Sequence, residues 1–78
     1  MNGYKNYETW NVALWISSDY ALYSAAIRFM ESYKGRSPYR SFINMMGMSM
    51  KKTGDRVAWI SKSLSYSELN RMMRDLID

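Results

Sequence analysis

The sequence predicts a small, mainly α-helical single domain spanning residues 1–78, with about four helices around a central apolar helix. Three observations favour this fold class. Apolar residues recur at spacings of three and four in several stretches, which is the period of a helix that buries one face. Residues that favour helix ends, such as Asp19, Gly35 and Pro38, separate those stretches. Seventy-eight residues, of which 47% are hydrophobic, suit one folded domain rather than a disordered chain.

The first expected helix covers residues 10–16, where apolar side chains point in nearly every direction around the helix axis. Such a helix would lie at the centre of the domain. Glu8 or Thr9 can open it, and no turn residue interrupts it before Ser17. A buried strand at residues 12–16 is the alternative, because a short apolar run fits either structure.

The second expected helix has Asp19 as its N-cap, and Gly35 suits the left-handed position after its end. Its charged residues Arg28, Glu31 and Lys34 are expected to face away from the core. The apolar face is expected to consist of Leu22, Tyr23, Ala26, Ile27, Met30 and Tyr33.

The third expected helix begins with Ser37 as N-cap and Pro38 at its first position, where a missing amide hydrogen costs nothing. We expect it to run on to Met50, with Lys51 and Lys52 beside its negative end. Gly47 would weaken the middle of this helix by about 1 kcal/mol and suggests a bend. The methionines at 45–50 fit an adaptable core better than an adaptable binding face.

The C-terminal third of the chain holds one ambiguous segment and one expected helix. Residues 57–60 suit either a short strand or an extended segment that inserts Trp59 into the core. Ser65 and Glu68 have the spacing of a capping box, in which each side chain bonds to the other residue's amide. The helix that follows is expected to bury Leu69, Met72, Met73, Leu76 and Ile77.

The residues that usually carry catalysis or bind metals are absent from this chain. It has no histidine and no cysteine, which excludes Ser/His/Asp triads and nearly every zinc or iron site. Its four glycines are isolated, so no glycine-rich phosphate loop is present. We therefore expect no enzyme, no catalytic residue, no metal and no cofactor. Glu8 is the one carboxylate without a plain role, and helix capping is favoured over a functional role.

Soluble, cytoplasmic localisation is expected, because no apolar stretch is long enough for a membrane span and no signal peptide is evident. Between residues 28 and 62 the chain carries eight basic and two acidic residues, whereas the two ends together carry three basic and five acidic residues. A basic middle favours an anionic partner, either an acidic protein surface or a nucleic acid. The candidate binding residues are Arg28, Lys34, Arg36, Arg40, Lys51, Lys52 and Arg56.

Aromatic residues leave two further binding modes open. Tyr33, Tyr39 and Trp59 lie among the basic residues and could stack on nucleic-acid bases. A second set of tyrosines would mark a protein interface if its members were exposed together. The chain could also form a homodimer, because a short chain without disulfides gains stability from association. This second set comprises Tyr4, Tyr7, Tyr20, Tyr39 and Tyr66.

A resemblance to a known group of proteins rests on the opening stretch Tyr7-Glu8-Thr9-Trp10-Asn11-Val12-Ala13-Leu14-Trp15-Ile16. This stretch, the following Asp19-Tyr20-Ala21-Leu22-Tyr23 and the C-terminal residues 65–76 are similar to small phage, plasmid and cyanobacterial proteins without an assigned activity. The resemblance implies a phage-type accessory protein in the host cytoplasm that binds and modulates a host protein or nucleoprotein, in host takeover or anti-defence. Those relatives tend to be acidic, which would suit mimicry of DNA. This basic chain instead favours a partner with an acidic surface, with direct nucleic-acid binding as the alternative.

Overall fold

The computed structural model describes residues 3–78, which form four helices: α1 (Tyr7–Ser18), α2 (Tyr20–Ser32), α3 (Pro38–Met45) and α4 (Tyr66–Asp75). No strand occurs within these residues, and the only pairing of the strand type among them is an isolated antiparallel bridge between Lys52 and Ala58. The prediction of a small, mainly helical domain is therefore confirmed, and residues 57–60 are not a strand.

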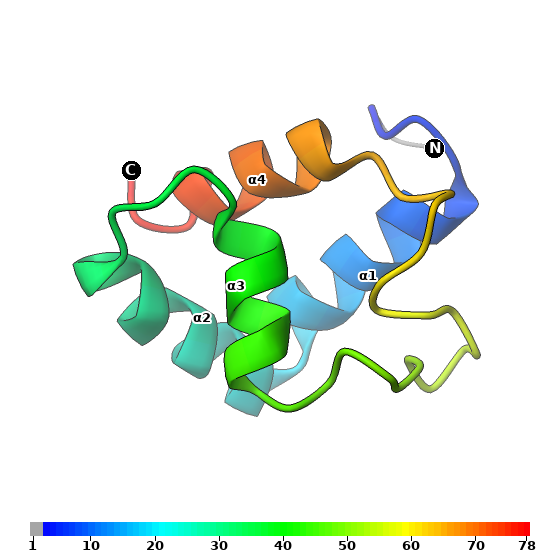
Figure 1. Cartoon of the computed structure of the whole chain (residues 1–78), viewed down its shortest axis with the longest axis horizontal. Coiled ribbons are helices and arrows are strands. Elements are labelled where there is room, and N and C mark those ends of the chain that lie inside the picture. Colours follow the sequence, from blue (N-terminus) through cyan, green and yellow to red (C-terminus); the bar gives the residue numbers. More distant parts are fainter. Residues whose placement is uncertain (1–2) are drawn as a thin grey trace.

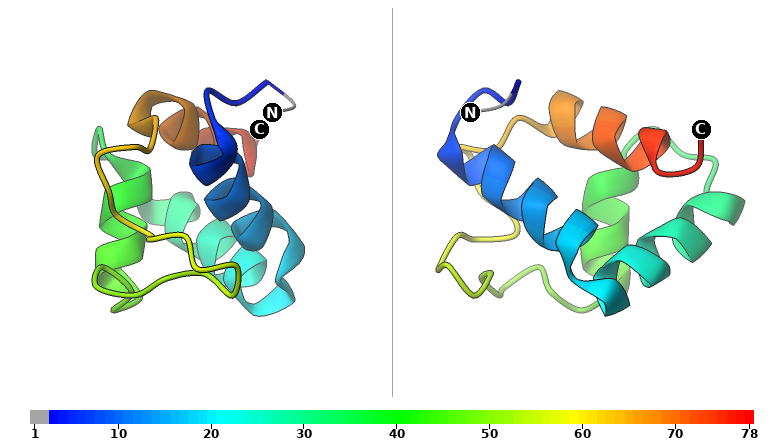
Figure 2. Two further views of the ribbon diagram at one scale, coloured as in Figure 1. Left: turned by 90° about the vertical axis from the view of Figure 1, so that its right-hand side faces the viewer. Right: turned by 180° about the vertical axis from the view of Figure 1, so that it is seen from behind.

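Helices α1 and α2 form a V whose point is the single residue Asp19 (Figures 1 and 2). The backbone of Asp19 is extended, its amide donates to the Trp15 carbonyl at 3.0 Å, and its Oδ1 accepts from the Leu22 amide at 3.0 Å. One residue thus caps the end of α1 and the start of α2, as predicted for α2. Helix α4 lies across the open side of the V, and α3 stands against α2 and α4.

Helix α1 begins earlier than predicted. Its N-cap is Asn6, whose Oδ1 accepts from the Thr9 amide at 2.9 Å, so the expectation that Glu8 or Thr9 caps the helix is wrong. Thr9 is buried inside the helix instead. The helix is also less enclosed than its apolar sequence predicts, because Tyr7 and Leu14 are exposed on one side.

Helix α2 buries fewer residues than its periodicity predicts. Ala26 and Met30 are buried, but Tyr23 is 38% exposed. Gly35 does not adopt a positive φ, so its predicted left-handed role is wrong. It is needed for space, because a Cβ at this position would lie 2.3 Å from the hydroxyl oxygen of Tyr33.

Helix α3 ends at Met45, five residues before its predicted end, because Gly47 adopts φ +71°. The Gly47 amide donates to the Asn44 carbonyl and the Met48 amide to the Ile43 carbonyl, both at 3.0 Å, which is the Schellman motif of a helix end. Lys51 and Lys52 therefore do not lie at the negative end of a helix as predicted. At the other end Pro38 occupies the first turn, as expected, while Ser37 makes no capping hydrogen bond with its side chain.

Helix α4 begins after Ser65, whose Oγ accepts from the Glu68 amide at 3.4 Å. The return half of the predicted capping box is absent, because the Glu68 carboxylate accepts from the Lys5 amide instead, at 2.8 Å. Leu69 and Met73 are fully buried, whereas Ile77 lies beyond the helix and is 46% exposed, contrary to expectation.

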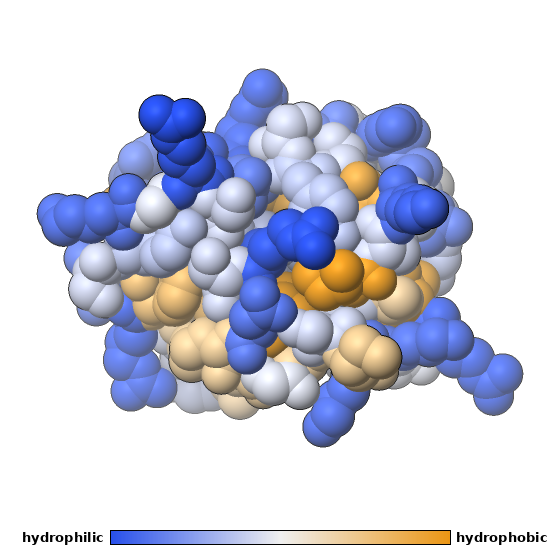
Figure 3. All heavy atoms as spheres, viewed as in Figure 1, coloured by the Kyte–Doolittle hydropathy of each residue, from blue (hydrophilic) through white to orange (hydrophobic). Residues whose placement is uncertain are grey.

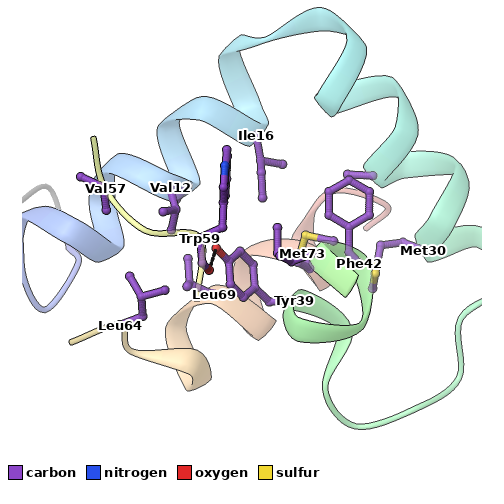
Figure 4. Packing of buried hydrophobic residues seen from close by; sticks show 13 residues of the cluster. Val12, Ile16, Met30, Tyr39, Phe42, Val57, Trp59, Leu64, Leu69 and Met73 are labelled. Atoms are coloured by element: carbon purple, nitrogen blue, oxygen red, sulfur yellow. Dashed lines mark hydrogen bonds between the residues drawn. The ribbon is translucent and has the colours of Figure 1, made fainter. Parts of the chain in front are cut away.

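Residues 46–65 form a long segment without helix or strand, which is unusual in so small a domain. The segment is ordered by the side chains it contributes to the core, namely Val57, Trp59 and Leu64 (Figure 4). Trp59 is 4% exposed, and its carbonyl accepts from the hydroxyl of the fully buried Tyr39 at 2.7 Å. Of the two alternatives that the sequence left open for residues 57–60, the structure therefore shows the segment that inserts Trp59 into the core.

Candidate functional site

All seven candidate basic residues are exposed, and the fold divides them between two regions. The last turns of α2 and the α2–α3 connection, at the left of Figure 1, carry Arg28, Lys34 and Arg36. The segment 46–65, at the lower right, carries Lys51, Lys52 and Arg56. On the face seen in Figure 3, hydrophilic side chains project around the rim, with apolar side chains visible between them. The basic middle of the sequence is therefore not one continuous patch.

Arg40, the seventh residue, lies in the first turn of α3. Its guanidinium carbon is 5.0 Å from the ring centroid of Tyr66, the distance of a cation–π contact. The contact covers part of Tyr66 and orients Arg40 on the surface of the domain.

A buried hydrogen-bond network fixes the basic segment 46–65 to α1. Asn11 is 1% exposed and Thr53 is 6% exposed. The Thr53 hydroxyl donates to Asn11 Oδ1 at 2.8 Å and accepts from the Val57 and Asp55 amides at 3.2 Å each. Asn11 Nδ2 donates to Asp55 Oδ2 at 2.9 Å. Asn11 thus binds two residues of the turn, Thr53 and Asp55, through its amide oxygen and its amide nitrogen. These bonds attach the turn, and with it the neighbouring Lys51, Lys52 and Arg56, to α1.

Asp55 forms the outer edge of this network. Its Oδ2 also accepts from Trp15 Nε1 at 2.9 Å. The hydrogen bonds from Asn11 and Trp15 lower the pKa of the Asp55 carboxyl, so it stays ionised. Gly54 permits this arrangement, because a Cβ there would lie 2.6 Å from Cζ2 of Trp15.

Arg56 adopts a backbone conformation that is rare for its residue type. Its φ is +67°, in the left-handed region that favours glycine or asparagine. The turn is closed by hydrogen bonds from the Arg56 amide to the Thr53 carbonyl at 2.9 Å and from the Thr53 amide to the Val57 carbonyl at 2.8 Å. Arg56 therefore carries local backbone strain at an exposed turn.

A second set of hydrogen bonds attaches the other end of the basic segment to the start of α1. Asn6 Nδ2 donates to the Ser63 carbonyl at 2.6 Å. The Ser65 amide donates to Oγ1 of Thr9, a fully buried residue, at 3.0 Å. Within the motif Tyr7–Ile16, the polar residues Thr9 and Asn11 thus hold the basic segment, while Val12, Ala13 and Ile16 are buried in the core.

Sequence reasoning missed Thr9, Asn11 and Thr53 as positioning residues. A signal was present for Asn11, because it is a polar residue inside an otherwise apolar helix, and such a residue is usually hydrogen-bonded. Nothing local identified Thr53 as its partner, which lies 42 residues away along the chain.

Two of the three aromatic residues proposed to stack on bases are not available on the surface, and the third is only partly exposed. Tyr39 and Trp59 are buried, and Tyr33 is half-buried and stacked on Phe29 at a centroid distance of 4.9 Å. The tyrosines proposed for an interface are scattered: Tyr7 and Tyr20 are exposed, whereas Tyr4 and Tyr66 are half-buried and Tyr39 belongs to the core. Burial raises the pKa of the Tyr39 hydroxyl, which consequently stays neutral.

No three acidic side chains within residues 3–78 lie close enough together to hold a metal ion. None of the helices formed by those residues is long and apolar enough to span a bilayer.

No curated protein and no solved structure matches the chain. One family model matches residues 1–78, the whole length of the sequence. The chain therefore belongs to a family of unknown function, DUF7249.

Proposed function

We propose that this chain is a non-enzymatic binding protein that attaches to an acidic surface of another protein or nucleoprotein through its basic segment 46–65. One observation carries the proposal. Lys51, Lys52 and Arg56 are exposed on a segment that two buried residues, Asn11 and Thr53, hold against α1. A rigid base lowers the entropy lost when charged side chains engage a partner, which favours a preformed binding surface.

Two further features of the segment support protein binding. Met50 is 97% exposed directly beside Lys51, contrary to the expectation that the methionines at 45–50 belong to the core, so an adaptable apolar side chain adjoins the cations. Arg56 is held in a strained conformation at the tip of the turn, and strain of this kind clusters at functional sites. An acidic partner would gain Coulomb attraction from three cations and apolar contact from the methionine.

The biological setting of the proposal comes from the resemblance of residues 7–16 to phage, plasmid and cyanobacterial proteins. In that setting the chain acts in the host cytoplasm as an accessory protein of host takeover or anti-defence. The partner is then a host protein or nucleoprotein.

A matched pair of charge reversals tests the proposal. Lys51→Glu with Lys52→Glu and Lys34→Glu with Arg36→Glu change the net charge equally, and all four side chains are exposed, so neither pair should unfold the domain. We expect the first pair to abolish capture of a partner from host lysate and the second pair to retain it. Retention of the partner by the first pair, or its loss from both pairs alike, would contradict the proposed surface.

Direct nucleic-acid binding is the alternative function for the same cations. Tyr39 and Trp59 are buried, so two of the residues proposed to stack on bases cannot do so. Nucleic-acid binding would then depend on contacts between the cations and phosphate groups. A gel-shift series at rising salt discriminates between the two, because each phosphate contact steepens the fall of log K with log salt by about 0.9 for duplex DNA. If the chain binds nucleic acid with such a slope and Lys51→Glu/Lys52→Glu abolishes the binding, the partner is a nucleic acid and not a protein.

A further inference from the structure

The outward face of α2 is uncovered and hollow. Tyr20 is 83% exposed, far more than any other aromatic residue described as exposed. Viewed from behind, α2 lies on the outside of the molecule (Figure 2). A shallow depression of about 530 Å³ follows this face and is lined by Tyr20, Ala21, Ser24, Ile27 and Arg28.

The five lining residues are arranged symmetrically about Ser24. Tyr20 and Arg28 lie four residues before and after it, and Ala21 and Ile27 lie three residues before and after it. In a helix these positions share one face, and the rise of 1.5 Å per residue places each pair at equal distances from Ser24. A second α2 running antiparallel, related by a two-fold axis at Ser24, would therefore bring Ile27 opposite Ala21 and Arg28 opposite Tyr20.

We propose that this face of α2 binds a second copy of the chain in a two-fold symmetric dimer. The surface is complementary to itself, as such an interface requires. The small side chain of Ala21 leaves the depression that Ile27 of the other copy would enter. The Arg28 guanidinium would meet the exposed ring of Tyr20, an arrangement that favours a cation–π contact.

Charge complementarity adds to this shape match. Asp19 adjoins Tyr20 at the start of α2, so each Arg28 would approach a carboxylate as well as a ring. Each copy carries a net charge of +4, and this general repulsion is screened within about 8 Å at 0.15 M salt. The local attraction between Arg28 and Asp19 acts at shorter range and is less affected.

The size of the face sets the expected strength of the dimer. Thirteen residues of helix are about 20 Å long, and one face of that length cannot cover the ~800 Å² per partner of a standard interface. We therefore expect a weak, concentration-dependent dimer with a Kd on the order of 100 µM. Sedimentation should show monomer at about 10 µM and mostly dimer at about 1 mM.

A charge swap tests the pairing of Tyr20 with Arg28. Arg28→Glu alone would place a carboxylate against Tyr20 and Asp19, and Tyr20→Lys alone would place an ammonium against Arg28. We expect each single variant to weaken the dimer at least tenfold. The double variant restores opposite charges across the two-fold axis and should recover dimerisation. Dimerisation unchanged in both single variants, or no recovery in the double variant, would overturn the proposal.

Cysteine cross-linking tests the position of the axis, and the chain has no native cysteine to interfere. Helix axes 8–10 Å apart, with Cα atoms at a radius of ~2.3 Å, leave roughly 3.4–5.4 Å between facing Cα atoms, and the upper part of this range suits a disulfide. Ser24→Cys should therefore cross-link rapidly on mild oxidation, whereas Ser32→Cys, exposed at the end of the same helix, should remain monomeric. Equal rates for the two variants would overturn the proposal.

Neither test depends on the proposed function. Lys51 and Lys52 lie outside the α2 face, so Lys51→Glu/Lys52→Glu should leave dimerisation intact. An α2 variant that no longer dimerises but still captures its partner would show that dimerisation and partner binding use different surfaces.

Discussion

Replacing Thr53 by valine should destabilise the domain by about 2–3 kcal/mol, because the hydroxyl connects the basic segment to α1. Valine has nearly the same shape as threonine but cannot donate to Asn11 Oδ1, a bond of 2.8 Å. Leaving the buried acceptor unsatisfied costs about 1–3 kcal/mol, and the Val57 and Asp55 amides lose their acceptor as well, which places the expected loss in the upper part of this range. Asn11 is 1% exposed, so water cannot readily replace the lost donor.

This loss is large for a chain of 78 residues, whose total stability is on the order of 4–12 kcal/mol. It corresponds to a fall in Tm of roughly 10–20 °C, at about 4–8 °C per kcal/mol for domains of this size. Urea denaturation followed by tryptophan fluorescence measures it, since the buried Trp59 reports on unfolding of the core.

Thr53→Ser is the matched control for this prediction. Serine keeps the hydroxyl and loses one methyl group, which costs about 1 kcal/mol. We expect the order of stability wild type, Thr53→Ser, Thr53→Val. A serine variant less stable than the valine variant, or a valine variant as stable as wild type, would refute the role assigned to the hydroxyl.

A double-mutant cycle with Asn11→Leu isolates the bond itself. Removing both polar partners leaves neither one unsatisfied, so the double variant should be less destabilised than the sum of the single variants by at least about 1 kcal/mol. Additive losses would show that the two side chains contribute independently. Hydrogen exchange provides the structural readout, because amides of residues 51–58 should lose protection in Thr53→Val before those of α4.

Two further predictions concern the buried Tyr39 hydroxyl and the Asp55 carboxylate. Tyr39→Phe should cost about 1–2 kcal/mol in urea denaturation, because it removes the buried donor to the Trp59 carbonyl; an unchanged midpoint would contradict that role. Hydrogen bonds from Asn11 and Trp15 lower the pKa of Asp55, so its contribution to stability is present above the unfolded value of about 3.9 and is lost as the pH falls through the folded value. Thermal melts from pH 5 to pH 2.5 should therefore show a larger loss for wild type than for Asp55→Asn, and equal losses would exclude this linkage.

Local signals predicted the helix starts that depend on one or two residues. Asp19 caps α2 and Pro38 opens α3 as expected, because an N-cap or a first-turn proline acts within a single turn. Helix ends were predicted less well, since Gly35 and Gly47 both follow apolar periodic stretches. Gly47 adopts the left-handed conformation and ends α3, whereas Gly35 makes room for Tyr33. Periodicity alone does not distinguish these two uses of glycine.

The candidate binding residues illustrate a different limit. Charge along the sequence predicted a basic middle, and all seven residues are exposed. Their division into two regions could not be predicted, because it depends on where α3 ends and on how residues 46–65 fold back onto α1. That path is set by contacts between residues 40 or more positions apart, such as Thr53 with Asn11 and Asp55 with Trp15.

The sequence by itself determined the helical class and the capping of α2 by Asp19, since each follows from local preference, whereas for residues 57–60 it left a short strand and an extended segment open. Only the tertiary structure decided that Thr9 and Asn11 bind the basic segment, that Tyr39 is a core residue and that Tyr20 stands exposed on α2. The physical reason is that the polarity of a side chain determines whether it requires a hydrogen bond or burial in the core. Which residue provides the hydrogen bond or the contact depends on how distant segments pack.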